Sequence, residues 1–348
     1  MIKKVMGRER AYVRIMKILK NIKLAEYTTF HIGGKAEFFA EIKTIAELRE
    51  ATRFAKKNRL KIFILGGGSN VLLPDKGIKG LVIKMDIHGV KFNSDKVYAG
   101  AGEIWDQIVA QAVKNGLSGI ENLSLIPGTV GGAVYQNIGA YGVELKDILE
   151  SVEVFDIKYM TVKTLLNKAC SFKYRDSIFQ HPESKNYIIT GATLKLSREY
   201  IPNIKYPNLI KYFGSKNPSV QEMRQAVVRI RKSKLDYPTT NIGTVGSFFK
   251  NPVITVSEFK SLASKFPDII GRDFGNNQIK LFAGQLTEKA GWKGKKLKNV
   301  RVSKKHAIVL VSYKGAKSKD IINLAELIQK SVKTKFGIKL EPEVKIMA

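Results

Sequence analysis

The hydrophobic pattern begins with a β–α–β unit. Residues 37–42 (EFFAEI) and 61–65 (KIFIL) have the apolar content of short strands. Between them, Thr44 and Glu47 form a capping-box pattern, and residues 48–55 place apolar side chains at helical spacing. The second strand leads directly into a run of glycines.

A second unit follows the same order. Residues 96–99 predict a strand, and residues 104–113 predict a helix with one apolar face that Gly116 ends. Two further strands are predicted at residues 151–155 and 187–196. Strands therefore outnumber those of a simple doubly wound sheet, and the pattern indicates a mixed α and β fold.

The last third has its own pattern. Ser219 and Glu222 cap a predicted helix that runs to about Lys234. Pro238 and a glycine turn at residues 243–246 then indicate a domain boundary near Lys234. Beyond it, the pattern predicts helices at residues 257–265 and 318–335 and a strand at residues 307–312.

Length and composition bound the class of protein. A chain of 348 residues predicts two or three domains, and 44% hydrophobic with 26% charged residues is typical of a globular protein. A single cysteine, Cys170, excludes an internal disulfide and a cysteine-cluster metal site, and fits a reducing cytoplasm. The four histidines have no metal-binding spacing, so we predict no metal.

The chain is strongly basic. Its 60 Lys and Arg against 30 Asp and Glu give a net charge of +30, which attracts nucleic acids, anionic membranes or phosphorylated substrates. The charge is spread along the chain, which is more typical of a solvated surface than of a nucleic-acid footprint. We therefore expect no nucleic-acid partner.

No apolar run is long enough to span a membrane. The first twenty residues are basic and lack the apolar core of a signal peptide. They would form either a frayed extension, including one that arises from an upstream start codon, or a basic amphipathic helix on a membrane surface. We favour the extension, and expect no stable membrane insertion.

The first glycine loop reads Gly66-Gly67-Gly68-Ser69-Asn70 and follows a predicted strand. Consecutive glycines let backbone N–H groups approach an anion such as a pyrophosphate, and Ser69 and Asn70 add side-chain donors. Val71 and Pro74 do not fit the Rossmann fingerprint. Alone, such a loop is more often a tight turn than an anion site.

The second glycine loop spans residues 127–142. Its five glycines and few charges are not expected to form an ordinary helix or strand. Such a backbone could lie flat against a large ligand, although an irregular loop explains it as well. Together, the two loops favour a dinucleotide site.

Three polar residues stand out elsewhere, each with an ordinary explanation. Arg175 has a fork suited to a carboxylate, although a surface ion pair with Asp176 would account for it. Ser247 sits in a glycine turn without the pattern of a hydrolase elbow. Glu343 lies in a segment that reads as a solvated terminal strand.

Read together, these segments resemble the UDP-N-acetylenolpyruvoylglucosamine reductase family, from residue 21 to residue 346. Eight motifs occur in the family's order: TTFHIGG, GGGSN, IPGTVGGA, QNIGAYG, YRDS, GSFFKNP, AGWKG and EPEV. The resemblance implies an α+β fold, with a vanillyl-alcohol-oxidase-type FAD-binding domain in two subdomains and a separate α+β substrate-binding domain.

The resemblance also implies domain boundaries. These are a basic extension at 1–20, a first FAD subdomain at 21–86 with strand 341–348, a second FAD subdomain at 87–233, and a substrate domain at 234–340.

The resemblance implies the site residues too. The catalytic positions would be Arg175, Ser247 and Glu343. The substrate-binding positions would be Tyr174, Tyr206, Arg231, Lys234 and Asn251. FAD would be held by Gly66, Gly67, Gly68, Ser69, Asn70, Pro127, Gly128, Thr129, Gly132, Ala133, Asn137, Gly139, Ala140 and Tyr141.

The implied reaction is the NADPH-dependent, FAD-mediated reduction of an enolpyruvyl UDP-sugar in the synthesis of peptidoglycan precursors. The resemblance implies FAD and NADPH as cofactors, the UDP-sugar as the small-molecule partner, a cytoplasmic location and a monomer. Two alternatives stay open: another flavin oxidoreductase of the same fold acting on a different small substrate, and a basic nucleic-acid-binding protein without catalysis.

Overall fold

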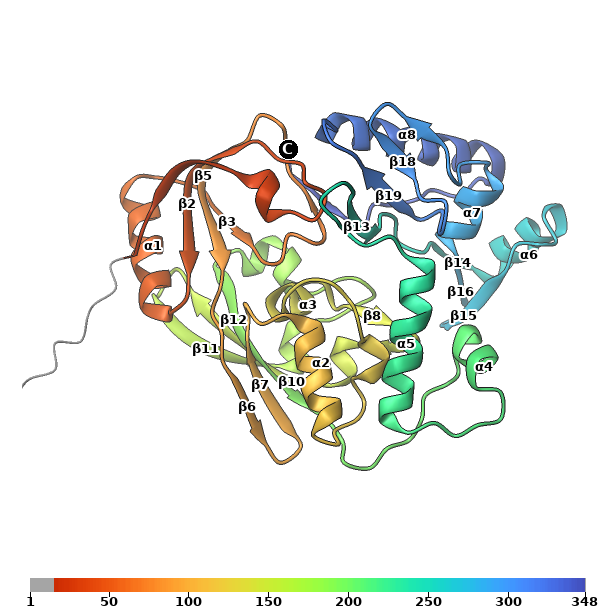
Figure 1. Ribbon diagram of the computed structural model, residues 1–348, viewed down its shortest axis with the longest axis horizontal. Helices are drawn as coiled ribbons and strands as arrows, with labels where there is room; N and C mark the ends of the chain where they lie inside the picture. Colours follow the sequence, from red (N-terminus) through yellow and green to blue (C-terminus); the bar gives the residue numbers. More distant parts are fainter. Residues whose placement is uncertain (1–15, 348) are drawn as a thin grey trace, which may run out of the picture.

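The computed structural model describes residues 16–347 of the chain, and the first of its sheets is a four-stranded mixed sheet (Figure 1). The order is β1-β2-β5-β3, with β2 and β3 both parallel to β5 and β1 antiparallel to β2. The elements are β1 (Leu19–Lys23), β2 (Lys35–Ile42), α1 (Ile45–Lys57), β3 (Ile62–Leu65) and β5 (Ile78–Met85). The predicted β–α–β unit is confirmed, and Thr44 caps α1 by accepting from the Glu47 N–H at 3.1 Å.

The second sheet has five antiparallel strands in the order β11-β10-β12-β7-β6. Its strands are β6 (Val90–Asn93), β7 (Lys96–Gly100), β10 (Leu149–Asp156), β11 (Thr161–Leu166) and β12 (Tyr187–Lys195). Helix α2 (Trp105–Lys114) packs beside it, and the buried Trp105 indole donates to the Leu123 carbonyl at 3.0 Å. One apolar core continues from α1 through α2 to this sheet, so the two sheets form one packed body.

The C-terminal part has a separate core. Two small sheets run β13-β19-β18-β17 and β14-β16-β15. Their strands are β13 (Gly243–Ser247), β14 (Val253–Thr255), β15 (Gly271–Gly275), β16 (Gln278–Leu281), β17 (Lys296–Leu297), β18 (Val300–Val302) and β19 (Val309–Ser312). The helices are α6 (Val256–Lys265), α7 (Ala283–Lys289) and α8 (Ser318–Phe336). This part lies at the upper right in Figure 1.

Helix α5 (Val220–Lys234) lies between the two parts, and α4 (Pro207–Phe213) lies beside it, below β15 (Figure 1). The two helices share a small apolar cluster. The predicted capping box of α5 is confirmed: Ser219 accepts from the Glu222 N–H, and Glu222 accepts from the Ser219 N–H. The remaining short strands are β4 (Val71–Leu72), β8 (Gly139–Ala140), β9 (Val143–Glu144) and β20 (Lys345–Ile346). The 3-10 helices are η1 (Leu24–Tyr27), η2 (Glu121–Leu123), η3 (Leu145–Asp147), η4 (Asn167–Cys170), η5 (Ile178–Gln180) and η6 (Pro182–Ser184).

The expectation for the second glycine loop was wrong. Residues 130–136 form an α-helix, α3 (Val130–Gln136), despite two internal glycines. Tertiary packing overrides the low helix propensity, because Val130 and Val134 are buried and Gly131 lies against Ala101. A Cβ at Gly131 would sit 3.0 Å from the Ala101 Cβ, so a glycine is what lets the helix approach.

The structure tests the predictions for the N-terminal end of the chain only in part. Strand β1 starts at Leu19, two residues before the expected start of the folded part. Most of the basic extension, residues 1–15, lies outside the described residues, and the proposed domain boundaries stay predictions. Between residues 16 and 347, no helix is both long and apolar enough to cross a bilayer.

The packing of α3 predicts different effects for two neighbouring glycines. Gly131→Ala and Gly132→Ala gain the same helix propensity, but only the first brings a Cβ against Ala101; at Gly132 the nearest atom is 3.8 Å away. We expect Gly131→Ala to have a free energy of unfolding about 1–3 kcal/mol below that of Gly132→Ala. Urea denaturation of the flavin-free proteins measures this difference. Equal stabilities would contradict the packing argument.

Candidate active site

A cavity of about 1300 Å³ lies between the N-terminal part, which contains the first two sheets, and the C-terminal part. It is larger than a typical pocket for a drug-sized ligand and has room for more than one such molecule. Both glycine loops, β13, α5, the segment before β19 and the segment after α8 contribute to its wall. The predicted residues that line it are Gly66, Gly67, Gly68, Ser69, Asn70, Pro127, Gly128, Thr129, Gly132, Ala133, Gly139, Ala140, Tyr141, Arg175, Tyr206, Arg231, Lys234, Ser247, Asn251 and Glu343.

The two glycine loops touch each other through their backbones. A Cβ at Gly67 would lie 2.9 Å from the Gly128 Cα, which leaves no room for a side chain. Gly68 has a φ of +64° and lies against the Tyr27 carbonyl, so it needs glycine both for conformation and for space. The Ser69 hydroxyl donates to the Pro127 carbonyl at 3.2 Å. This contact forms one continuous backbone wall.

The wall fits the diphosphate part of FAD. The Thr129 hydroxyl is buried and has no hydrogen-bond partner among the described residues. A Cβ at Gly66 would lie 2.8 Å from that hydroxyl, so the glycine keeps it uncovered. Small residues and a hydroxyl donor are what a close-lying pyrophosphate requires. Loops 66–70 and 127–133 would therefore hold FAD.

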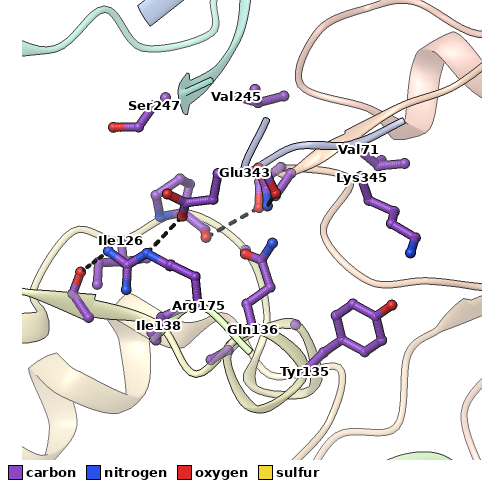
Figure 2. Close-up of a pocket in the computed structure, with 18 of the residues that line it drawn as sticks. Val71, Ile126, Tyr135, Gln136, Ile138, Arg175, Val245, Ser247, Glu343 and Lys345 are labelled. Atoms are coloured by element: carbon purple, nitrogen blue, oxygen red, sulfur yellow. Dashed lines mark hydrogen bonds and ion pairs between the residues drawn. The ribbon is translucent and has the colours of Figure 1, made fainter. Parts of the chain in front are cut away.

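The segment after α8 connects the first glycine loop to the C-terminal part. The Asn70 side-chain amide donates to the Glu343 carbonyl at 3.1 Å, and the Lys345 N–H donates to the Asn70 carbonyl at 3.1 Å. The Glu343 N–H in turn donates to the Phe248 carbonyl at 2.8 Å. This places Glu343 beside the end of β13, where Ser247 stands (Figure 2).

Arg175 lies across the cavity from Ser247 and pairs with Glu343 (Figure 2). Its Nε is 2.9 Å from the Glu343 Oε1, and its Nη2 donates to the Gly139 carbonyl at 2.6 Å. The simpler explanation, an ion pair with Asp176, is not what the structure shows, because Arg175 pairs with Glu343 and Asp176 pairs with His181 at 2.9 Å. Arg175 also has a φ of +54°, a strained conformation that clusters at functional sites.

Burial sets the protonation of this pair. Burial raises the pKa of the Glu343 carboxyl above its ordinary value, and the charges of Arg175 and Lys250 only partly oppose that rise. Burial by itself would lower the pKa of Arg175, but Glu343 and Tyr174 raise it, so the guanidinium stays charged. Glu343 is therefore a carboxyl that can hold a proton beside a permanent cation.

The far end of the cavity is basic. Arg231 and Lys234 from α5 line it with His306. Burial and then Lys211 lower the pKa of Lys234, while burial and then Lys234 lower the pKa of His306, which favours a neutral imidazole. This end can therefore bind a phosphorylated ligand through a small number of cations.

Two predicted contact residues do not line the cavity. Asn137 is fully buried, and its side chain bonds the Glu144 carboxylate, the Lys173 carbonyl and the Lys146 N–H. These hydrogen bonds give Asn137 a structural role, because they stabilise the turn that follows α3. Tyr174 packs against Phe274 with ring centroids 5.7 Å apart.

Several lining residues were missed by the sequence analysis. They include Arg272, Gln285, Lys305 and His306. The sequence offered no reason to select them, because the chain contains many polar residues and only the fold brings these four to one cavity. The glycine before Arg272 was the one local signal that a close backbone approach occurs there.

Comparison with known proteins decides the family. A protein of Flavobacterium johnsoniae named UDP-N-acetylenolpyruvoylglucosamine reductase is 40% identical over 341 residues, which cover 95% of this chain and all of that protein. One of the same name from Pseudomonas aeruginosa is 38% identical and covers 94% of this chain and 98% of its own. The chain belongs to the UDP-N-acetylenolpyruvoylglucosamine reductase family.

Two domain families match within the chain. Residues 237–347 match the C-terminal domain of UDP-N-acetylenolpyruvoylglucosamine reductase, and residues 36–163 match the FAD binding domain. A solved reductase of this family from Thermus caldophilus superimposes with a TM-score of 0.69 at 27% identity, over 96% of this chain and all of that one. The predicted α+β flavin fold is confirmed, and the chain is a flavin-dependent reductase of this family with FAD as its cofactor.

The contact between the glycine loops predicts the effect of Gly67→Ala. Its Cβ would push the loop at Gly128 out of position, and we expect FAD to bind at least about tenfold more weakly, equivalent to about 1.4 kcal/mol. Ser69→Ala, which removes only a 3.2 Å hydrogen bond, is the milder control. Flavin fluorescence titration of the flavin-free proteins measures both. FAD affinity unchanged by Gly67→Ala would contradict the close approach.

Proposed function

We propose that the protein reduces the enolpyruvyl group of UDP-N-acetylenolpyruvoylglucosamine to give UDP-N-acetylmuramate, with NADPH as the electron donor and FAD as the carrier. The observation that carries the proposal is the meeting of Arg175, Glu343 and Ser247 in one cavity with the flavin loops. The names of the relatives support the substrate. Bound between the two glycine loops, FAD would supply the hydride carrier between NADPH and the substrate.

Arg175 binds the substrate carboxylate. A guanidinium has five N–H donors, and its contacts with Glu343 and with the carbonyls of Gly139 and Asn137 leave two of them for a ligand. Hydride addition places negative charge on the carbon beside that carboxylate. A fixed cation stabilises this charge more than it stabilises the neutral substrate, which is the requirement for catalysis.

Glu343 supplies a second stabilising contact. Its raised pKa favours the protonated carboxyl, which donates a hydrogen bond to the developing enolate oxygen. An ionised carboxylate there would instead repel the same charge. Because the backbone of Glu343 is held from both sides, by Phe248 and Asn70, the donor is fixed in place before the substrate arrives.

Ser247 completes the reaction by giving its proton to the carbon. A hydroxyl is a weak acid, but an enolate carbon is a strong base, so the transfer is feasible. Ser247 is the last residue of β13, and its partner in the sheet is Val309. The strand keeps the hydroxyl on the cavity side, opposite Arg175 (Figure 2).

The basic end of the cavity binds the diphosphates. Arg231 and Lys234 lie at that end with Tyr206, whose ring would cover the substrate. NADPH and the UDP-sugar both carry a diphosphate, and one set of cations serves both in turn. Asn251 holds the neighbouring loop, because its side chain accepts from the Ala283 N–H at 2.9 Å.

Substituting the serine separates the two halves of the reaction. In Ser247→Ala, flavin reduction by NADPH needs no proton from residue 247, and its rate should stay within about threefold of wild type. Oxidation of the reduced flavin by the UDP-sugar should slow by up to about 10⁴-fold. Stopped-flow absorbance of the flavin band measures each half separately.

The outcome for each half has its own meaning. Equal slowing of both would show that Ser247 shapes the flavin site, which contradicts the role of proton donor. The free energy of unfolding serves as the control, because losing one hydroxyl should cost at most about 1–2 kcal/mol.

The protonation of Glu343 predicts a pH dependence. The protonated form is the active one, so the rate of the second half-reaction should fall as pH rises through the raised pKa of Glu343. The Glu343→Gln variant carries a permanent N–H donor. Its second half-reaction should be slower than that of wild type at low pH, but its rate should no longer fall as pH rises. Stopped-flow rates across pH test it, and a wild-type fall that persists in Glu343→Gln would assign the titration to another group.

A further inference from the structure

Tyr206 is held between two side chains from different parts of the molecule. Its ring meets the Tyr141 ring edge-on, with centroids 5.2 Å apart. On its other side, the Arg272 guanidinium carbon lies 4.8 Å from the ring centroid, within the range of a cation–π contact. All three side chains line the cavity. The position of this ring therefore depends on the C-terminal part, through Arg272.

The base of Arg272 is fixed. Arg272 lies in β15 and faces Lys280 of β16 in the antiparallel register. The preceding residue, Gly271, packs so tightly that a Cβ would come within 2.9 Å of the Phe259 ring and closer still to Ile279. The strand therefore cannot shift without breaking this packing, and the arginine projects from a rigid support.

The tip of Arg272 makes a second contact with the same segment. Its Nη2 donates to the Lys205 carbonyl at 3.0 Å, so one guanidinium engages the backbone of residue 205 and the ring of residue 206. Figure 1 shows α4, which follows Tyr206, beside the end of β15. A planar guanidinium can make both contacts at once, whereas an ammonium cannot reproduce this geometry.

The residues on either side of Lys205 and Tyr206 are attached to the N-terminal part and to α5. The Asn122 side chain donates to the Asn203 carbonyl at 3.0 Å, and Leu209 and Phe213 of α4 pack with Met223 of α5. Arg272 thus supplies the contact from the opposite side of the cavity. Without it, the Tyr206 ring keeps its contacts with Tyr141 and with the apolar cluster of α4 and α5 but loses its cation–π contact with the C-terminal part.

We propose that Arg272 is a positioning residue that holds Tyr206 over the substrate end of the cavity and so sets the affinity for the nucleotide-sugar. The inference rests on the proposed function for the identity of that ligand. Arg272 acts through Tyr206 and takes no part in the transfer of hydride or proton. Its loss should therefore raise KM far more than it lowers kcat.

The first test compares two arginines that touch the same segment. Arg272→Gln should raise KM for the UDP-sugar about tenfold and leave kcat within about threefold. Arg272→Lys should fall between that variant and wild type. Arg229→Gln is the matched control, because Arg229 contacts Tyr212 of α4 at 3.3 Å without lining the cavity, and its KM should stay within about twofold. Equal KM changes in Arg272→Gln and Arg229→Gln would overturn the inference.

A double substitution tests whether Arg272 acts through the tyrosine. If it does, Tyr206→Leu with Arg272→Gln should have the same KM as Tyr206→Leu alone, within about twofold. If Arg272 served the substrate by a direct contact only, the two effects on KM would multiply. Multiplication would overturn the inference.

A third measurement needs no substrate. Lys205 is exposed, and trypsin cleavage after it in the FAD-loaded enzyme reports how often the segment leaves its place. Mass spectrometry should show cleavage at Lys205 at least about threefold faster in Arg272→Gln than in Arg229→Gln. Equal rates would overturn the inference. Failure of the enzyme to turn over the UDP-sugar would overturn the proposed function alone, because this measurement does not depend on it.

Discussion

The active site depends on the backbone hydrogen bonds of one segment, residues 341–347. On one side it bonds the residues that directly follow Ser247 and β13, through the Lys250 N–H to the Glu341 carbonyl and the Glu343 N–H to the Phe248 carbonyl. On the other side it bonds the first glycine loop and continues as β20, parallel to β4. The glycine-loop wall and Ser247, the proposed proton donor, belong to parts with different cores, and this segment sets the distance between them. A backbone connection suits that purpose, because it varies less than a contact between flexible side chains.

The Arg175–Glu343 pair is costly as a structural feature and useful as a chemical one. A buried ion pair adds little net stability, because removing both charges from water offsets their attraction. Here the cost appears as a raised pKa for Glu343 and an unusual backbone conformation at Arg175. The same features favour a protonated carboxyl beside a fixed cation, which is what the proposed reaction requires where negative charge develops. The site thus gives up some stability for a prepared electrostatic environment.

Local patterns predicted most of the elements. The caps at Thr44 and Ser219 fixed the starts of α1 and α5, and apolar periodicity placed the main strands. The pattern failed at α3, where burial of Val130 and Val134 outweighs two glycines. The catalytic positions came from the family resemblance, because no spacing rule relates Arg175 to Glu343 across such a distance in the chain. Beyond the glycine that precedes it, Arg272 gave no sign of its place, since its contact with Tyr206 arises only when two separate parts meet.

The hydrogen bond between Asn70 and Glu343 joins residues separated by 273 positions in the sequence. A chain is synthesised from its N-terminus, so the first glycine loop leaves the ribosome long before the segment that fixes it exists. Contacts between such distant residues form late and slowly. The nucleotide-binding wall can therefore adopt its final shape only when nearly the whole chain is available. Tight retention of the yellow cofactor becomes a sign that synthesis and folding are finished, and a chain stalled partway would be expected to remain colourless.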